Sequence, residues 1–166
     1  MDNKYNAFIS STSRDLLEYR ALIINSCIDA NMFPIAMEHF IPENANALQV
    51  CYNELQKADL FIGIYAHRYG YAPDSSVTYT DSKGNLRAGD GVTGITEWEY
   101  IWAKEMEMPI VILVIDPDAD WKASDIEHKK KDQLDAFKER IGKELVYKVF
   151  TDKHDFHVKI VSILKD

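Results

Sequence analysis

The sequence predicts an α/β protein with a three-layer α/β/α, flavodoxin-like fold and a five-stranded parallel sheet. The main observation is that short runs of apolar and β-branched residues alternate with amphipathic helical stretches along the chain. Such alternation is typical of parallel strands joined by crossover helices that cover both faces of the sheet. A second observation is the length of 166 residues, which suits one domain with a substantial core. We therefore expect a single domain over residues 1–166.

The first half of the chain is expected to form three strands and two helices. The strands are predicted at residues 5–10, 33–37 and 60–65, and the helices at residues 14–31 and 44–55. Asn44 is the expected N-cap of the second helix, because an asparagine side chain can accept from amides of the first turn. The first helix is expected to bury apolar residues at three- and four-residue steps, namely Leu16, Leu17, Ala21, Ile24, Cys27 and Ile28.

A long connection, residues 71–93, separates the third strand from the second half of the chain. It contains a turn at residues 81–85, and we expect a small hairpin or lid there. The later elements are predicted as helices starting at Thr96, at Ser124 and near Asp155, and as strands at residues 110–115 and 145–150. Glu99 and Glu127 follow Thr96 and Ser124 by three residues, and this spacing is typical of capping boxes.

The composition limits the classes of function. The net charge is -8, and the basic run at residues 128–131 lies among acidic residues, so no nucleic-acid-binding surface is expected. Cys27 and Cys51 fall in helical runs and are expected to be buried free thiols in a reducing compartment. The five histidines show no metal-ligand spacing. No stretch is long and apolar enough to span a bilayer, so we expect a cytoplasmic protein without membrane contact.

Polar residues gather where the predicted topology forms a crevice. In a flavodoxin-like strand order, ligands bind beyond the carboxyl ends of the strands, beside the first strand. The residues expected to meet there are Ser10, Ser11, Thr12, Glu38, Arg68 and Tyr69, together with Trp98 and Glu99 from the helix that starts at the same edge. This convergence predicts a ligand site.

Each of these residues also has a purely structural interpretation. The hydroxyl run ahead of the first helix can hold a phosphate or a ribose, or it can only cap the helix. Arg68 and Tyr69 can hold a phosphate and stack on a base, or they can be surface residues. Glu99 is either a capping side chain or a carboxylate at the mouth of the site. The chain has no GxGxxG, P-loop or GxSxG pattern, which argues against those nucleotide-binding and hydrolase classes.

Four motifs, taken in order, resemble domain-of-unknown-function family 4062. They are Phe8–Asp15, Met37–Phe40, Arg68–Gly70 and Thr96–Tyr100, and together they span nearly the whole chain. Ser13 departs from the family pattern, which often has an aromatic residue at that place. The resemblance implies a domain of the kind often found at the front of signal-transducing ATPases, so an attached or partner ATPase is expected.

This family is in turn similar to TIR domains and to nucleoside 2-deoxyribosyltransferases. Thr96, Glu99, Ala103 and Pro109 match the spacing of a transferase motif, although Ile95 stands where that motif has glycine. In both groups of relatives a glutamate acts on an N-glycosidic bond. The resemblance therefore implies that Glu99 is the catalytic residue.

Besides the carboxylate, cleavage of an N-glycosidic bond needs ribose contacts and an aromatic wall. Glu97 faces elsewhere on the helix and is not expected to be catalytic. Ser10 and Glu38 would contact ribose, and Tyr69 or Trp98 would form an aromatic wall. Neither a metal nor a cofactor is expected.

Three functional hypotheses follow from the resemblance. The first is a TIR-like effector that cleaves the N-glycosidic bond of NAD and releases nicotinamide, in prokaryotic immune defence, with NAD as the substrate and with self-association. The second is a non-catalytic TIR-like interaction domain attached to an ATPase. The third is nucleoside deoxyribosyl transfer, which needs a second base to accept the sugar.

Overall fold

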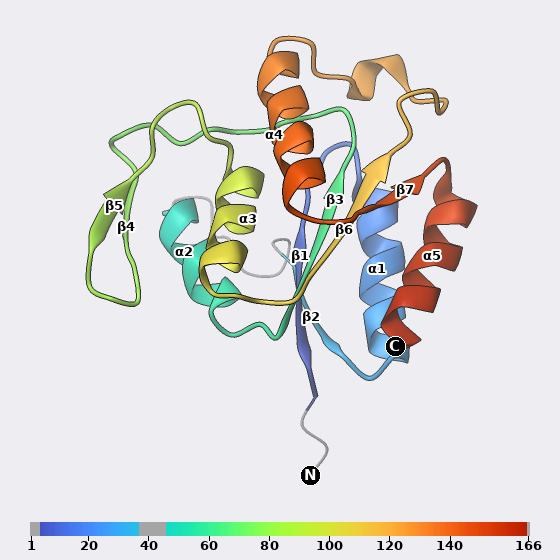
Figure 1. The fold of residues 1–166 in the computed structure, drawn as a ribbon, viewed down its shortest axis with the longest axis horizontal. Helices are drawn as coiled ribbons and strands as arrows, with labels where there is room; N and C mark the ends of the chain where they lie inside the picture. Colours follow the sequence, from blue (N-terminus) through green and yellow to red (C-terminus); the bar gives the residue numbers. More distant parts are fainter. Residues whose placement is uncertain (1–3, 37–45, 166) are drawn as a thin grey trace.

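A computed structural model describes residues 4–36 and 46–165. Its main sheet has five parallel strands: β1 (Asn6–Ser10), β2 (Phe33–Ala36), β3 (Leu60–Tyr65), β6 (Ile110–Ile115) and β7 (Lys148–Phe150). The strands lie in the order β2-β1-β3-β6-β7, as Figure 1 shows. This order is flavodoxin-like, and the direction of winding reverses between β1 and β3. The predicted fold class is therefore confirmed.

Two layers of helices cover the sheet (Figure 1). Helices α1 (Leu17–Asp29) and α5 (Lys153–Lys165) pack on one face, and α2 (Ala47–Leu55), α3 (Ile95–Glu105) and α4 (Lys131–Glu144) pack on the other. Successive residues of β1 point to opposite faces of the sheet. Ala7 and Ile9 accordingly belong to the core beneath α1 and α5, and Phe8 belongs to the core beneath α2 and α3.

The long connection after β3 forms an antiparallel hairpin of β4 (Thr78–Thr80) and β5 (Leu86–Ala88). It is anchored by Tyr79, whose hydroxyl accepts a 2.8 Å hydrogen bond from the indole nitrogen of Trp102. Arg87 pairs with Glu105 at 3.0 Å, and its guanidinium lies over the rings of Tyr79 and Trp98. The hairpin therefore packs against the outer side of α2 and α3.

The expected N-cap at Thr96 is wrong. Helix α3 is capped by Gly94, and Thr96 lies inside the first turn. The Thr96 hydroxyl instead donates to the backbone carbonyl of Tyr69, at 3.4 Å. Since Glu99 is bonded to Ser10 on another element, no capping box forms at this helix.

The expected helix start at Ser124 is also wrong. Only a short 3₁₀ turn forms there (Ala123–Asp125), and α4 starts at Lys131. The carboxylate of Glu127 accepts from backbone amides of the segment after β3, so it does not turn back to cap Ser124. The expected cap Asn44 lies outside the described residues, and the structure has Asn46 as the N-cap of α2, accepting from the amide of Gln49.

The buried face of α1 differs from the predicted one. Leu17 and Ile28 are each 58% exposed, whereas Tyr19, Ile23 and Cys27 are buried. The ring of Tyr19 packs against the rings of Phe150 and Phe156, and this aromatic contact turns its side of the helix toward the core. The helix is apolar over most of its circumference, so the three- and four-residue spacing did not specify which stripe is buried.

The cysteines are as expected, since Cys27 and Cys51 are buried free thiols. Within residues 4–36 and 46–165, no helix has the length and apolar character that crossing a membrane requires.

Candidate active site

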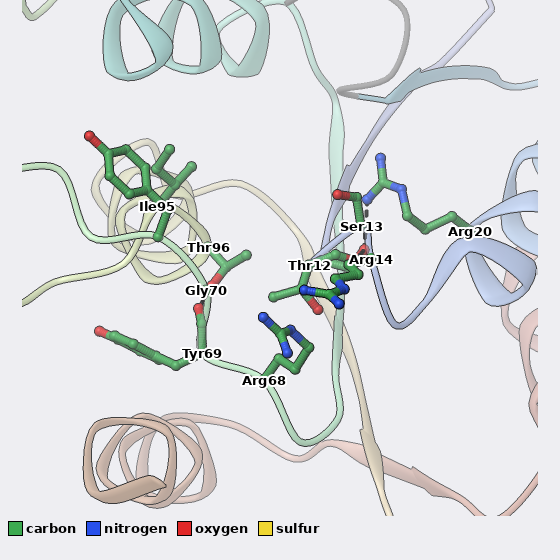
Figure 2. Close-up of a pocket in the computed structure, with 11 residues that line it drawn as sticks. Thr12, Ser13, Arg14, Arg20, Arg68, Tyr69, Gly70, Ile95 and Thr96 are labelled. Carbon is green, nitrogen blue, oxygen red and sulfur yellow. Dashed lines mark hydrogen bonds between the residues drawn. The ribbon is translucent and has the colours of Figure 1, made fainter. Parts of the chain in front are cut away.

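A pocket of about 370 Å³ lies at the carboxyl ends of β1 and β3, where the strand order reverses (Figure 2). It is lined by residues that follow β1 and β3 and by residues of α1 and α3: Ser11, Thr12, Ser13, Arg14, Arg20, Arg68, Tyr69, Gly70, Tyr71, Ile95 and Thr96. Ligands of α/β sheets usually bind at such a switch point. Among the residues expected to bind a ligand, Ser11, Thr12, Arg68 and Tyr69 line this pocket.

Glu99 is completely buried on the sheet side of α3. Its Oε1 accepts a 3.0 Å hydrogen bond from the hydroxyl of Ser10, and that hydroxyl lies 3.3 Å from the hydroxyl of Tyr65. Its other oxygen, Oε2, makes no hydrogen bond to a nitrogen or oxygen of any described residue. A carboxylate so placed at the end of a buried strand is an uncommon feature, because buried polar atoms are normally paired.

Burial raises the pKa of Glu99 from 4.5 to about 8. Removal of the carboxylate from water dominates this rise, because the charged form is the one that loses solvation. The Ser10 hydroxyl, the positive charge of Arg20 and the thiol of Cys51 oppose it. Glu99 is therefore largely protonated at neutral pH in the free protein, and a nearby positive charge would favour its ionised form.

Glu99 and its partner Ser10 do not line the pocket, but each lies close along the chain to a residue that does. Ser11 and Thr96 line the pocket, and Ser10 and Glu99 are their neighbours on the same elements, one residue before Ser11 and one helical turn after Thr96. Residues three apart on a helix share a face. Glu99 therefore lies on the same side of α3 as Thr96, one turn further along the helix, and its bond to Ser10 joins it to the end of β1.

Arg20 is a site residue that the sequence analysis missed. It is 1% exposed, and its Nη1 donates a 2.6 Å hydrogen bond to the hydroxyl of Ser11. A signal was present in the sequence, because Arg20 lies four residues after Leu16 and four before Ile24, two residues that the sequence predicts to be buried. Arginine within a buried helical stripe is rare unless it is paired. Its place in the stripe could have marked it as functional.

The segment of Arg68, Tyr69 and Gly70 is held in place by Glu127. The carboxylate of Glu127 accepts from the amide of Tyr69 at 3.1 Å and from the amide of Gly70 at 3.3 Å. It also forms an ion pair of 3.6 Å with Arg68. Lys130 donates to the Gly70 carbonyl at 2.6 Å. One side chain from the loop before α4 thus fixes three consecutive residues of the pocket wall.

Tyr69 connects this segment to the start of α3. Its hydroxyl accepts from the amide of Gly94 at 3.0 Å and donates to a carboxylate oxygen of Glu97 at 2.8 Å. Burial and this bond to the carboxylate raise the pKa of Tyr69. Burial likewise raises the pKa of Glu97. Tyr69 therefore fixes the first turn of the helix that carries Glu99, in addition to lining the pocket.

The structure does not bring every predicted residue to the pocket. Trp98 is 9% exposed and packs with Tyr79 and Trp102 under the hairpin, away from the pocket lining. Glu38 lies outside the described residues. Within the described parts of the chain, no group of three or more His, Cys, Asp or Glu side chains is arranged to hold a metal ion.

The fold and this site together define an α/β domain with a pocket at the switch point of its sheet and a buried carboxyl group on a helix that lines the pocket. The chain belongs to the family described as "Domain of unknown function (DUF4062)", whose model matches residues 6–165. The resemblance drawn from the four sequence motifs is therefore confirmed.

The chain is also similar to parts of two curated proteins. It is 37% identical over 82 residues to telomerase protein component 1 of Mus musculus and, at the same identity and length, to that of Rattus norvegicus. Each match covers 41% of this chain and 3% of the relative. Among solved structures, the chain is similar to the Clostridium botulinum CMP N-glycosidase BcmB, with a TM-score of 0.47 and 14% identity over 93% of this chain and 97% of that one.

Proposed function

We propose that this domain is a TIR-like N-glycosidase that cleaves the bond between the base and the ribose of a nucleotide, with Glu99 as the catalytic carboxylate. NAD is the proposed substrate, nicotinamide the proposed leaving group, and prokaryotic immune defence the proposed setting. The proposed substrate, leaving group and biological setting rest on the resemblance to TIR domains.

The observation that carries the proposal is the placement of Glu99. Glu99 is fully buried, with one carboxyl oxygen bonded to Ser10 and the other without a nitrogen or oxygen donor among the described residues, and it lies one helical turn after Thr96, which lines the pocket. Its pKa is raised to about 8 by burial. A titratable group that is perturbed in this way beside a pocket is typical of a catalytic site.

The chemistry fits one carboxylate. Cleavage breaks the bond between C1′ and the base nitrogen, and the electron pair leaves with nicotinamide, whose ring becomes neutral. C1′ then carries positive charge shared with the ring oxygen, and an adjacent carboxylate stabilises it. Water adds to C1′ and gives up a proton. A carboxylate with a pKa of about 8 is well matched to accept that proton near neutral pH.

The reaction needs Glu99 in its ionised form, and the positive charge of the nicotinamide ring favours that form. Glu99 is mainly protonated in the free protein, but a cation within a few ångströms favours the charged form. NAD binding would thus generate the carboxylate beside C1′. A neutral base lacks this effect, and its departure would instead require a proton from an acid.

The test is incubation of concentrated protein with NAD, followed by assay of free nicotinamide and ADP-ribose. We expect release by the parent protein and loss of release in a folded Glu99→Gln variant. The same assay is run with the protein fused to an oligomerising tag, because self-association is part of the hypothesis. Absence of release from the parent under both conditions would refute the proposal.

A second candidate function is a non-catalytic interaction domain, with a signal-transducing ATPase as the proposed partner. It is favoured by exposed apolar side chains at the end of α1 and on the edge strand β2, since Ile28 is 58% exposed, Phe33 is 57% exposed, and both line one surface pocket. Exposed apolar residues that lie together often mark interaction surfaces. This function predicts that Glu99→Gln leaves partner binding intact and that charged substitutions at Phe33 abolish it.

A further inference from the structure

The pocket concentrates positive charge in an acidic protein. The chain carries a net charge of -8 and has five arginines. Three of them, Arg14, Arg20 and Arg68, line this one pocket, and no aspartate or glutamate is among its described lining residues. A cleft lined by charge of one sign attracts ligands of the opposite charge, so this lining is suited to an anionic ligand.

Two of these arginines are placed to contact a ligand. Arg14 is exposed and forms no hydrogen bond or ion pair with any residue that the structure describes. Arg68 pairs with Glu127 through Nη2 at 3.6 Å, which engages one nitrogen of a group with five N–H donors. In Figure 2 the side chains of Arg14 and Arg68 point toward one another beside Thr12.

The remaining arginine and the hydroxyl groups complete the lining. Arg20 lies deeper and donates to the Ser11 hydroxyl, so it orients that group and adds positive charge to the pocket wall. The Thr12 hydroxyl donates to the carboxylate of Asp15. Asp15 is 9% exposed and interacts electrostatically with Arg68, so together with Glu127 it offsets part of the positive charge. Guanidinium groups beside hydroxyls are suited to bidentate binding of a phosphate.

We propose that the pocket is a phosphate subsite in which Arg14 and Arg68 bind a phosphate group of the nucleotide substrate, so that the domain acts on nucleotides and discriminates against nucleosides. This inference rests on the proposed function for the identity of the reaction, but the subsite itself is a claim about binding. The phosphate comes either from a nucleoside monophosphate or from the diphosphate bridge of an NAD-type dinucleotide.

The position of the subsite also orients the sugar. A phosphate at Arg14 and Arg68 lies on the outer side of the pocket, and Ser11 and Thr96 form the wall that adjoins Ser10 and Glu99. The ribose would then extend from the phosphate toward that wall, which directs C1′ to the buried carboxyl group. Binding energy from the phosphate would thereby position the bond that breaks.

Calorimetric titration of a Glu99→Gln variant tests the subsite without consuming the ligand. The ligands are nucleoside and nucleotide pairs with different bases: nicotinamide riboside with its mononucleotide, adenosine with AMP, and uridine with UMP, together with NAD. We expect the phosphorylated member to bind at least about ten-fold more tightly, because hydrogen bonds to charged groups contribute that much. A gain confined to NAD identifies the diphosphate as the source, and a gain for mononucleotides identifies the monoester.

Arg14→Ala and Arg68→Ala, each made in the Glu99→Gln background, should abolish the preference for the phosphorylated ligand and leave the nucleoside affinity unchanged. Arg14 is exposed, so its variant keeps the test valid if Arg68→Ala does not fold. Lys143→Ala, at a side chain 76% exposed on α4, removes the same charge elsewhere and should preserve the preference.

Equal affinities for all of the nucleosides, mononucleotides and NAD, no binding of any nucleotide, or a phosphate preference that Arg14→Ala or Arg68→Ala leaves intact would overturn the inference. A different result would refute the proposed function without refuting the phosphate subsite. A phosphate preference that depends on the two arginines, with no base released by the parent protein from any nucleotide, would refute the glycosidase and leave the subsite established.

Discussion

Replacement of Glu99 by glutamine should stabilise the protein increasingly as the pH rises. In the unfolded chain a glutamate titrates near its ordinary value of 4.5, whereas burial raises the pKa of Glu99 to about 8 in the folded chain. A raised carboxyl pKa means that folding carries no cost from this group below pH 4.5 and the full cost above pH 8. The Gln variant has no such titration.

The size of the effect follows from the two pKa values. Each pKa unit between the folded and unfolded states corresponds to about 1.4 kcal/mol, so the full cost of ionised Glu99 is about 5 kcal/mol. At pH 5 the cost is about 1 kcal/mol, and at pH 9 it is close to its full value. The free energy of unfolding of the Gln variant, relative to the parent, should therefore rise by about 4 kcal/mol between pH 5 and pH 9.

The assay is urea unfolding followed by tryptophan fluorescence at several pH values between 5 and 9. Glutamine keeps an oxygen that accepts from Ser10, so any loss of packing enters as a constant offset. Glu139→Gln, at a side chain 69% exposed on α4, is the matched control and should show a small difference with little pH dependence. A difference between Glu99→Gln and the parent that does not change with pH would refute the burial argument.

Three further predictions concern activity, the pocket wall and the hairpin. In the proposed mechanism the ionised form of Glu99 stabilises C1′, so kcat/KM for NAD should rise with pH and level off near 8; a rate that falls above pH 8 would instead show Glu99 acting as an acid. Glu127→Ala should weaken nucleotide binding about ten-fold, because it releases the amides of the pocket wall. Glu127→Gln keeps an oxygen that accepts from these amides, so its loss of nucleotide affinity in the same titration should be smaller. Tyr79→Phe leaves the indole nitrogen of Trp102 without its acceptor and should lower the free energy of unfolding by about 1–3 kcal/mol. Its nucleotide affinity should equal that of the parent protein, because the hairpin is not expected to be part of the site.

Much of the fold could be predicted from the sequence because its signals are local. The apolar runs at residues 60–65 and 110–115 became β3 and β6 without change of bounds. Alternation of strands and helices then required parallel pairing with helices on both faces. The switch point, and with it the location of the pocket, follows from that topology.

Both capping boxes failed for the same physical reason. A glutamate at the third position of a helix can cap that helix, but it can also accept a hydrogen bond from another element. The sequence does not specify which of the two bonds forms. Glu99 accepts from Ser10 on β1, and Glu127 accepts from amides after β3. The Glu127 contacts hold two residues of the pocket wall, and the Glu99 contact joins α3 to the end of β1. A glutamate in a capping motif beside an expected site is therefore also a candidate for a tertiary contact there.

Arg20 could not be assigned a role from the sequence because its partner lies on another element. Its place in the apolar stripe predicted for α1 is visible in the sequence, whereas its bond to Ser11 depends on how the turn after β1 folds. Trp98, in contrast, was predicted to be a site residue but does not line the pocket. It lies next to Glu99 in the chain, but adjacent residues on a helix point in different directions, and Trp98 packs under the hairpin.

The most direct test of the central claim is the rate of nicotinamide release from NAD by Glu99→Gln and by Glu139→Gln, each compared with the parent at equal folded concentration. The account predicts that nicotinamide release by Glu99→Gln is at least about a hundred-fold slower than release by the parent, the range expected for loss of a catalytic carboxylate, and that Glu139→Gln keeps the parent's rate. A folded Glu99→Gln variant that releases nicotinamide as fast as the parent would contradict the claim that this buried carboxyl group is the catalytic centre.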